Sequence, residues 1–166
     1  TEKLVFLSRM DEESTKLIML DFSISDAVLE VAQGFEAVAT SQGKTLNLDI
    51  DNNLSYCGDE TTIRQLVSLL LDNAMKYSDE NGKITVSLKS NGKSRVITVT
   101  NSVDKIEKGK HDELFERFYR ADSSRNSETG GHGIGLSVVK AIANAHKGKA
   151  ICYSNDENSI TFKITL

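Results

Sequence analysis

The sequence predicts an α+β fold, a two-layer sandwich in which three helices cover one face of a mixed, mostly antiparallel sheet. Two periodicities support this. Several short segments alternate apolar and polar residues, as half-buried strands do, and three longer segments repeat apolar residues every three or four positions, as amphipathic helices do. The chain has 166 residues, enough to bury one self-sufficient core. We therefore expect one domain with five or more strands.

The first helix is expected after a short extended piece over residues 20–24. Ser25 or Asp26 is the expected N-cap, and the helix continues to about Thr40. Its apolar positions are Val28, Val31, Phe35 and Val38.

Strands over residues 45–50 and 54–57 precede the second helix, which runs from about Glu60 to Tyr77. Asp59 is its expected N-cap. The spacing of its apolar residues predicts a buried stripe made of Ile63, Val67, Leu70 and Ala74.

A hairpin of strands over residues 84–88 and 96–100 is expected next, because the dipeptide Asn91-Gly92 supplies the positive φ angles of a tight turn. A long irregular region over about 101–130 follows, and one short helix over about 112–119 interrupts it. A loop of this length in a small domain is typical of a lid over a site.

The third helix follows a glycine-rich segment and continues to about His146, with Gly148 as the expected residue after its C-terminus. A final hairpin is expected from strands over residues 150–154 and 160–166.

Composition excludes some classes of function. The formal net charge is −4 with a pI near 5.4, and no stripe of Lys or Arg follows the chain, which argues against nucleic acid as a partner. Cys57 and Cys152 are far apart, lack the spacing of a metal site, and are expected to be buried free thiols of a reducing compartment. No apolar run approaches the roughly 18 residues of a membrane span, and no signal peptide is visible.

The segment Gly130–Leu136 reads Gly-Gly-His-Gly-Ile-Gly-Leu and leads into the third helix. Glycines let the backbone approach a phosphate closely, and the helix N-terminus offers free N–H groups and a positive dipole end. The segment is not a Rossmann fingerprint, because no βαβ unit surrounds it. It is not a P-loop, because no Lys-Ser/Thr pair follows the glycines. The alternative is a flexible loop that ends in a helix cap.

The end of the second helix carries a second group of polar residues. Leu69, Asn73 and Lys76 share one face beside the buried stripe, and Tyr77 lies at its boundary. An amide oxygen and an ammonium on this edge suit a Mg²⁺–nucleotide, since Mg²⁺ prefers hard oxygen ligands and Lys meets phosphate as a point charge. The alternative is an amphipathic helix with a solvated Asn and Lys.

Residues 113–120 combine two phenylalanines with two arginines. Phe115 and Phe118 are placed to pack inward, while Arg117 or Arg120 could reach phosphate oxygens when a lid closes. The alternative is that this segment only anchors the lid.

Together, these segments resemble the ATP-binding catalytic domain of sensor histidine kinases, in the superfamily that includes gyrase, Hsp90 and MutL. The resemblance covers residues 21–166. Residues 72–78 are similar to the N box of that family, 115–122 to its F box and 131–136 to its second glycine box. The three motifs occur in the family's order and spacing, and the F box distinguishes sensor kinases from the other branches.

The resemblance implies Mg-ATP as the ligand, with Asn73 on Mg²⁺ and Lys76, Arg117 and Arg120 as the other catalytic residues. The implied nucleotide-binding residues are Asn73, Lys76, Tyr77, Asn101, Ile106, Phe115, Phe118, Gly131, His132, Gly133, Ile134, Gly135 and Leu136.

Two of the departures from the family pattern lie in the site itself. The first glycine box, Asp-x-Gly-x-Gly, aligns with residues 101–105, where Asn101 replaces the adenine-binding Asp and both glycines are absent. The Asn carbonyl can still accept a hydrogen bond from the adenine amino group. Leu69 stands where an Asn is usual, which removes a polar contact; a lost hydrogen bond to a charged group costs about 1.5–3 kcal/mol, or about 10–100-fold in affinity.

The third departure is the absence of the phosphoacceptor histidine box, since His111, His132 and His146 all lie in other contexts. We therefore expect residues 1–16 to be the end of the preceding phosphoacceptor-domain helix and its linker, and residues 17–166 to be the ATP-binding catalytic domain.

The expected function is that of a protein-histidine kinase. The domain binds Mg-ATP and donates the γ-phosphate to a histidine on a separate dimerisation and phosphoacceptor domain of the same protein, for transfer to a response regulator. We expect a monomeric, cytoplasmic fragment; whether the parent is dimeric and lies in the inner membrane is left open. The alternative is a degenerate domain acting as a regulatory or interaction module. A serine kinase of the same fold is disfavoured by the F box.

Overall fold

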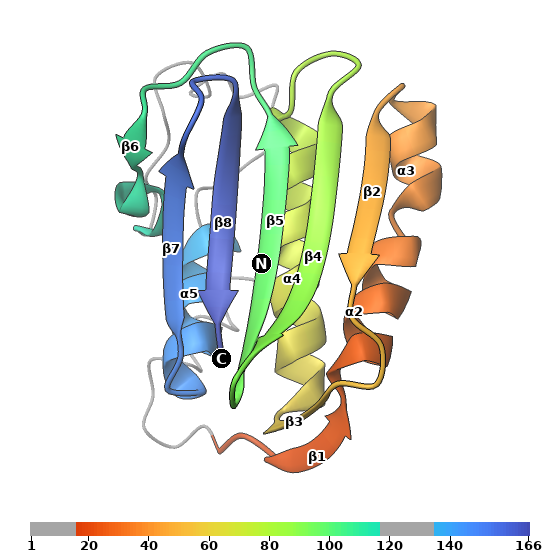
Figure 1. The fold of residues 1–166 in the computed structure, drawn as a ribbon, viewed down its shortest axis with the longest axis vertical. Helices are drawn as coiled ribbons and strands as arrows, with labels where there is room; N and C mark the ends of the chain where they lie inside the picture. The colour runs from red at the N-terminus through yellow and green to blue at the C-terminus, as the bar shows by residue number, and fades with distance from the viewer. Residues whose placement is uncertain (1–15, 117–134) are drawn as a thin grey trace.

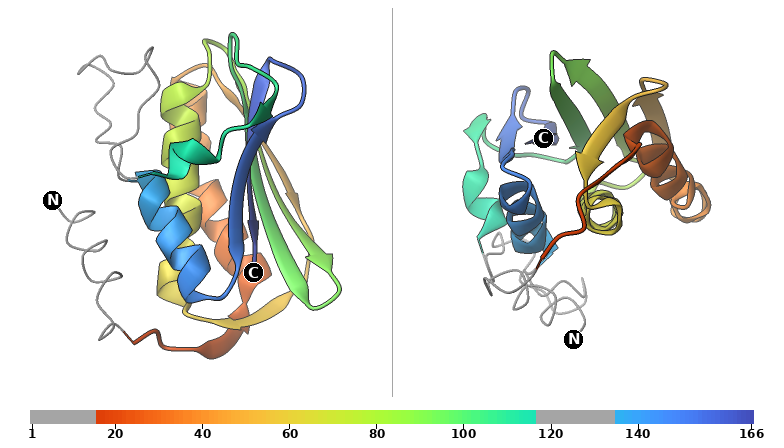
Figure 2. Two further views of the ribbon diagram at one scale, coloured as in Figure 1. Left: turned by 90° about the vertical axis from the view of Figure 1, so that its left-hand side faces the viewer. Right: turned by 90° about the horizontal axis from the view of Figure 1, so that it is seen from below.

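Helices pack on one face of a six-stranded sheet and leave its other face open, as Figures 1 and 2 show. The computed structural model describes residues 16–116 and 135–166. The three longer helices are α2 (Ile24–Gln33), α4 (Glu60–Tyr77) and α5 (Gly135–Ala145). The expected α+β sandwich is confirmed.

The sheet is mixed, with strand order β2-β4-β5-β8-β7-β6. The first pair, β2 with β4, is parallel, and the other pairs are antiparallel. The bounds are β2 Thr45–Ile50, β4 Lys83–Asn91, β5 Ser94–Ser102, β6 Gly109–Lys110, β7 Lys149–Ser154 and β8 Ser159–Thr165. A separate two-stranded sheet pairs β1 (Leu20–Ser23) with β3 (Ser55–Gly58).

Helix α4 forms as its sequence predicts. Asp59 caps it, with one carboxylate oxygen accepting the N–H of Thr62 at 2.9 Å. The predicted stripe is buried in the core: Ile63, Val67, Leu70 and Ala74. The helix packs against α2, α5 and β5, so its last turns are placed by the core.

The predicted cap of the first helix is wrong. Ser23 is the N-cap of α2, and its hydroxyl accepts the N–H of Asp26 at 3.2 Å. Ser25 is buried instead, where its hydroxyl donates to the carbonyl of Asp51 and accepts the N–H of Leu54. This serine therefore ties α2 to the turn before β3, a contact that local capping rules do not anticipate.

The predicted continuous helix up to Thr40 is also wrong, because the chain breaks it after Gln33. Gly34 and Phe35 form a turn, and the short helix α3 (Glu36–Ser41) follows it. Val38, which the 3.6-residue periodicity predicted to face inward, lies on α3 and is 39% exposed.

The C-terminus of α5 is a Schellman motif centred one residue earlier than predicted. Lys147, with φ 60°, takes the left-handed position. Its N–H donates to the carbonyl of Asn144, and the N–H of Gly148 donates to that of Ala143. Gly148 is needed for another reason, since a Cβ there would lie 2.2 Å from the carbonyl oxygen of Thr165.

Two turns differ in detail from their predictions. Asn91 pairs with Ser94, so the hairpin turn is Gly92-Lys93, and only Gly92 has positive φ, 62°. The predicted helix over 112–119 begins as one 3₁₀ turn, η1 (Asp112–Phe115), and residues 117–119 lie outside the described residues.

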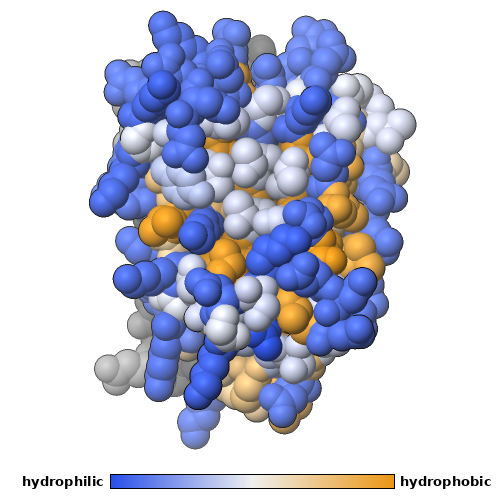
Figure 3. Space-filling view, in the orientation of Figure 1, coloured by the Kyte–Doolittle hydropathy of each residue, from blue (hydrophilic) through white to orange (hydrophobic). Residues whose placement is uncertain are grey.

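Both cysteines are free, but only one is buried as predicted. Cys152 is buried on β7, and burial raises the pKa of its thiol. Cys57 is exposed, because β3 pairs only with β1 and one face of this small sheet meets solvent. The open face of the main sheet is mixed, with apolar side chains visible between polar ones (Figure 3), and there Ile151 is 39% exposed.

We predict opposite effects for two Lys→Gly substitutions, one just after the C-terminus of α5 and one in its interior. Lys147→Gly should raise the free energy of unfolding by about 0.5–1 kcal/mol, because glycine adopts positive φ without steric cost. Lys140→Gly, at an exposed interior position of the same helix, should lower it by about 1 kcal/mol. Urea unfolding measures both; a loss of stability in Lys147→Gly contradicts the assignment of the motif.

Candidate functional site

The last turns of α4 present three of the predicted site residues. Asn73 and Tyr77 are partly exposed, and Lys76 is exposed. Within the described residues, neither Asn73 nor Lys76 has a hydrogen bond or ion pair through its side chain. An amide and a cation in this state are available to a ligand.

The start of α5 lies beside this face of α4. A Cβ on Gly135 would lie 3.7 Å from a methyl group of Leu69, which is itself only 6% exposed. Leu69, Asn73 and Lys76 are spaced by four and three residues and so share one face. The start of α5 therefore lies against Leu69, on the face of α4 that also carries Asn73 and Lys76, and Leu69 is an apolar contact between the two helices.

Asn101, at the end of β5, is fully buried. Its amide nitrogen donates to the carbonyl of Ser102 at 3.1 Å, but its amide oxygen has no partner within the described part of the chain. The buried hydroxyls of Ser78, at the C-terminus of α4, and of Ser154, on β7, are also unpartnered there. Buried polar atoms are rarely left unpaired, so each of the three indicates a point that a ligand or water completes.

A set of hydrogen bonds ties the end of α4 to the end of β5. The hydroxyl of Ser102 donates to the carboxylate of Asp79 at 2.5 Å and accepts the N–H of Lys83. Gly82 permits the approach, because a Cβ there would lie 2.7 Å from the Ser102 hydroxyl oxygen. Asn101 is therefore held at a set position relative to the last turn of α4.

Lys44 is a supporting residue that the sequence reasoning missed. Its ammonium donates to the carbonyls of Met75 and Ser78, which the end of α4 leaves without helical partners. Burial lowers the pKa of Lys44, and the nearby charge of Asp79 partly opposes this effect. The contact spans 31 residues, and no local pattern signals it.

The described part of the predicted lid is fastened to the sheet. Phe115 is 2% exposed and packs edge-on against Phe162, with ring centroids 5.8 Å apart. The carboxylate of Asp112 accepts the N–H of Cys152 at 2.8 Å, and the N–H of Ile106 donates to the carbonyl of Glu157 at 2.9 Å. Phe115 therefore packs inward as predicted, while Arg117 and Arg120, on which the two interpretations of this segment differ, lie outside the described residues.

Several predicted site residues lie outside the described residues. They are Arg117, Phe118, Arg120, Gly131, His132, Gly133 and Ile134. Of the glycine segment, Gly135 and Leu136 are described, and both are partly exposed at the start of α5.

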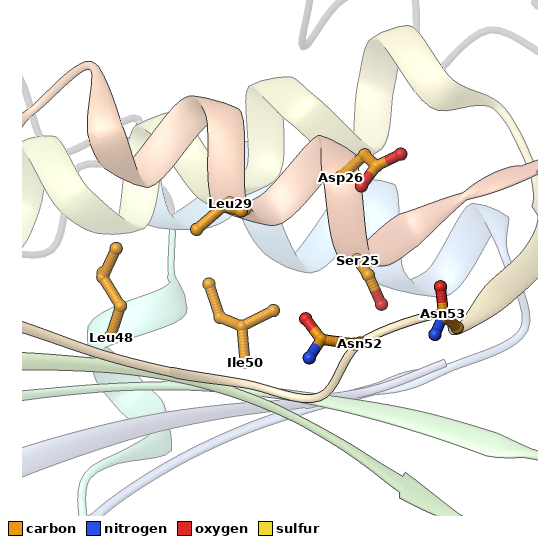
Figure 4. Close-up of a pocket in the computed structure, with 7 residues that line it drawn as sticks. All are labelled: Ser25, Asp26, Leu29, Leu48, Ile50, Asn52 and Asn53. Atoms are coloured by element: carbon orange, nitrogen blue, oxygen red, sulfur yellow. The ribbon is translucent and has the colours of Figure 1, made fainter.

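A cavity of about 320 Å³ lies elsewhere, between α2 and the end of β2 (Figure 4). Leu29, Leu48 and Ile50 form its apolar wall, and its lining includes none of the predicted site residues. The hydroxyl of Ser25 on its rim is already satisfied by backbone groups.

Comparison with known proteins identifies the family. A family model described as histidine kinase-, DNA gyrase B- and HSP90-like ATPase matches residues 58–166. The chain belongs to this family. The matched segment contains α4, the end of β5 and α5, which are the elements that form the candidate site.

Relatives place the chain among the catalytic domains of sensor histidine kinases. It is 34% identical to the sensor protein DltS of Streptococcus agalactiae over 156 residues, 94% of this chain and 39% of DltS. The histidine kinase AdeS of Acinetobacter baumannii is 26% identical with a TM-score of 0.79, over 99% of this chain and 75% of that one. The catalytic domain of ThkA, 24% identical, shares the fold with a TM-score of 0.75 over 90% of this chain and 95% of that one.

The chain spans about two fifths of the length of DltS. Within residues 16–116 and 135–166, no helix has the length and apolarity that a membrane span requires.

We predict that Phe115→Ala lowers the free energy of unfolding by about 3–5 kcal/mol, because it removes a fully buried aromatic ring. The matched control is Ile151→Ala on the open face of the sheet, which should change stability by no more than about 0.5 kcal/mol. Urea unfolding measures both. A loss below about 1 kcal/mol in Phe115→Ala would mean that this ring is free to leave the core and contact a ligand.

Proposed function

We propose that this domain binds Mg-ATP and donates the γ-phosphate to a histidine on a separate dimerisation and phosphoacceptor domain of the same protein. The observation that carries the proposal is the buried, unpartnered amide oxygen of Asn101, held at the same end of the domain as the unpaired side chains of Asn73 and Lys76.

Asn101 is suited to recognise adenine. Its nitrogen is engaged with the carbonyl of Ser102, and this bond orients the amide so that the oxygen remains the available acceptor. The adenine amino group is a donor that satisfies this oxygen. Guanine has an oxygen at the equivalent position, which would bring two acceptors together and leave the buried oxygen of Asn101 unpaired.

Asn73 and Lys76 are suited to the triphosphate. By the family resemblance, and because an amide oxygen is a hard ligand, we assign Mg²⁺ to the amide oxygen of Asn73 together with phosphate and water oxygens. Lys76 supplies a point charge for phosphate, and the start of α5 supplies N–H groups. Tyr77 and Ile106 are assigned to the wall of the nucleotide site.

The remaining assignments come from the family resemblance. Arg117 and Arg120 would neutralise phosphate charge as the lid closes, the backbone from Gly131 to Leu136 would wrap the triphosphate, and Phe118 would contact the nucleotide. Mg²⁺ when bound neutralises charge that develops on the phosphate oxygens. The protein contributes position and charge, so the acceptor histidine can lie on a separate domain.

The further partner is a response regulator. ThkA, which shares this fold, was solved in complex with the response regulator TrrA. We place residues 1–16 at the end of the phosphoacceptor domain and its linker, a stretch of which residues 1–15 lie outside the described residues, and residues 17–166 in the catalytic domain, acting in the cytoplasm.

A second candidate function is a regulatory or interaction module that no longer uses ATP. Leu69 favours it, because this side chain is buried against the start of α5 and offers no polar contact where the family usually has an Asn. Calorimetry with a non-hydrolysable ATP analogue separates the candidates: no heat at high ligand concentration, with or without Mg²⁺, supports the module.

We predict that Asn73→Ala weakens Mg-ATP binding by about 10–100-fold, because an oxygen ligand of the metal is lost. The wild-type dissociation constant is expected in the micromolar to millimolar range. Removing Mg²⁺ with EDTA should weaken binding to the wild type and have little further effect on the variant. Asn47→Ala, an exposed site on β2, is the control. Unchanged Mg-ATP affinity in Asn73→Ala would disprove the metal role.

We predict that Asn101→Leu lowers the preference for ATP over GTP by about two- to tenfold, the value of one neutral hydrogen bond. The ratio of the two dissociation constants is the measurement, since it cancels general damage to the site. An unchanged ratio would show that Asn101 does not read the base. Phosphoryl transfer itself is tested by mixing the domain, ATP and a separate histidine-bearing domain and measuring acid-labile phosphate.

A further inference from the structure

Asp59 makes hydrogen bonds to three separate elements. One carboxylate oxygen accepts the N–H of Thr62 and caps α4, and the other accepts the N–H of Ile18 at 2.9 Å. The backbone N–H of Asp59 donates to Nε2 of His146 at 3.0 Å. Partial burial favours the neutral carboxyl group, but the N–H donors outweigh it and lower the pKa of Asp59. The residue therefore joins the segment before β1, the start of α4 and the end of α5.

His146 is the partner at the end of α5, and it is buried. Because its Nε2 accepts the N–H of Asp59, the proton lies on Nδ1, which donates to the carbonyl of Ile142 at 2.9 Å. Both ring nitrogens are used, so the ring bridges the end of α5 and the start of α4.

A second line of contacts reaches the same histidine. Phe22 on β1 meets Tyr56 on β3 edge-on, with centroids 6.1 Å apart, and Tyr56 lies 6.0 Å from the ring of His146. Gly58 permits this packing, because a Cβ there would lie 2.3 Å from the ring of Tyr56 and 3.1 Å from that of His146. The segment that enters at β1 thus reaches α5 through polar and aromatic contacts together.

This junction lies at the ends of α4 and α5 that are remote from the candidate site. At about 1.5 Å per residue, α4 extends about 27 Å and α5 about 16 Å from it. The left panel of Figure 2 shows the entering segment and β1 beneath these helix ends. The segment is held chiefly by its backbone, since Ile18, Met19 and Leu20 are 70%, 45% and 64% exposed.

We propose that Asp59 is a positioning residue that fixes the path of residues 16–19 relative to α4 and α5. Its consequence for the reaction rests on the proposed function: if these residues connect to the phosphoacceptor domain, their path decides where the acceptor histidine meets the γ-phosphate.

The test separates the two carboxylate oxygens. Asparagine is as good an N-cap as aspartate, so Asp59→Asn keeps the cap through its amide oxygen and replaces the oxygen facing Ile18 with an NH₂ group that cannot accept. Amide hydrogen exchange followed by NMR should show Ile18 exchanging at least about tenfold faster in this variant and Thr62 within about twofold of the wild type. Asp59→Ala should accelerate both amides.

Asp21→Asn is the matched control, because Asp21 is exposed on β1 and its side chain has no hydrogen bond among the described residues. It should alter neither amide. Unchanged Ile18 exchange in Asp59→Asn overturns the proposal, and so does equal acceleration of Ile18 and Thr62, which would reduce Asp59 to a helix cap.

A second readout concerns the reaction. With the phosphoacceptor domain joined in front of this chain, Asp59→Asn should lower kcat for histidine phosphorylation several-fold and leave KM for ATP unchanged. With that domain added as a separate molecule, it should have no effect. Equal effects in both formats overturn the positioning role. A wild type that binds no Mg-ATP overturns the proposed function instead, while the exchange result for Ile18 still stands.

Discussion

The burial of α4 is the constraint on which the rest of the molecule depends. Nine of its 18 residues are buried, against α2, α5 and β5, so the core sets both its rotation and its position along the sheet. Once the apolar stripe faces inward, the 3.6-residue period places Asn73 and Lys76 on the same face as Leu69, which meets Gly135 at the start of α5. The end of the helix is then fastened, by Lys44 at its carbonyls and by Asp79 at β5. Side chains that could bind a charged ligand are thus oriented by apolar packing that never touches the ligand.

The two departures from the family pattern differ in their effect on contacts with a nucleotide. Asn101 keeps an acceptor oxygen in a buried position and orients it through the bond to Ser102, so its chemistry toward an amino group survives. Leu69 exchanges a polar contact for packing between α4 and α5. That packing fixes the start of α5 relative to α4, but it supplies no polar contact to a ligand.

The two ends of the helical layer have separate tasks. One end carries the unpaired polar groups, and the other carries the junction of Asp59, Tyr56 and His146. There both carboxylate oxygens of Asp59 and both ring nitrogens of His146 are hydrogen-bonded. Hydrogen-bonded groups hold each other in place, whereas unpaired groups are available for binding. Helices α4 and α5 both run from one end to the other. The path of residues 16–19 and the arrangement of the candidate site therefore depend on the same two helices.

The sequence by itself determined whatever depends on local periodicity and on motifs: the α+β sandwich, the buried stripe and N-cap of α4, and the identity of Asn73 and Lys76 as the polar residues flanking that stripe. Only the tertiary structure decided the contacts between distant segments. Ser25 is drawn away from a capping role by Asp51 and Leu54, Cys57 faces solvent because β3 joins a small separate sheet, and Lys44 and His146 find partners 31 and 87 residues away. Local patterns record which face of an element is apolar; they do not record which polar group of another element will meet it, because that follows from how the elements pack.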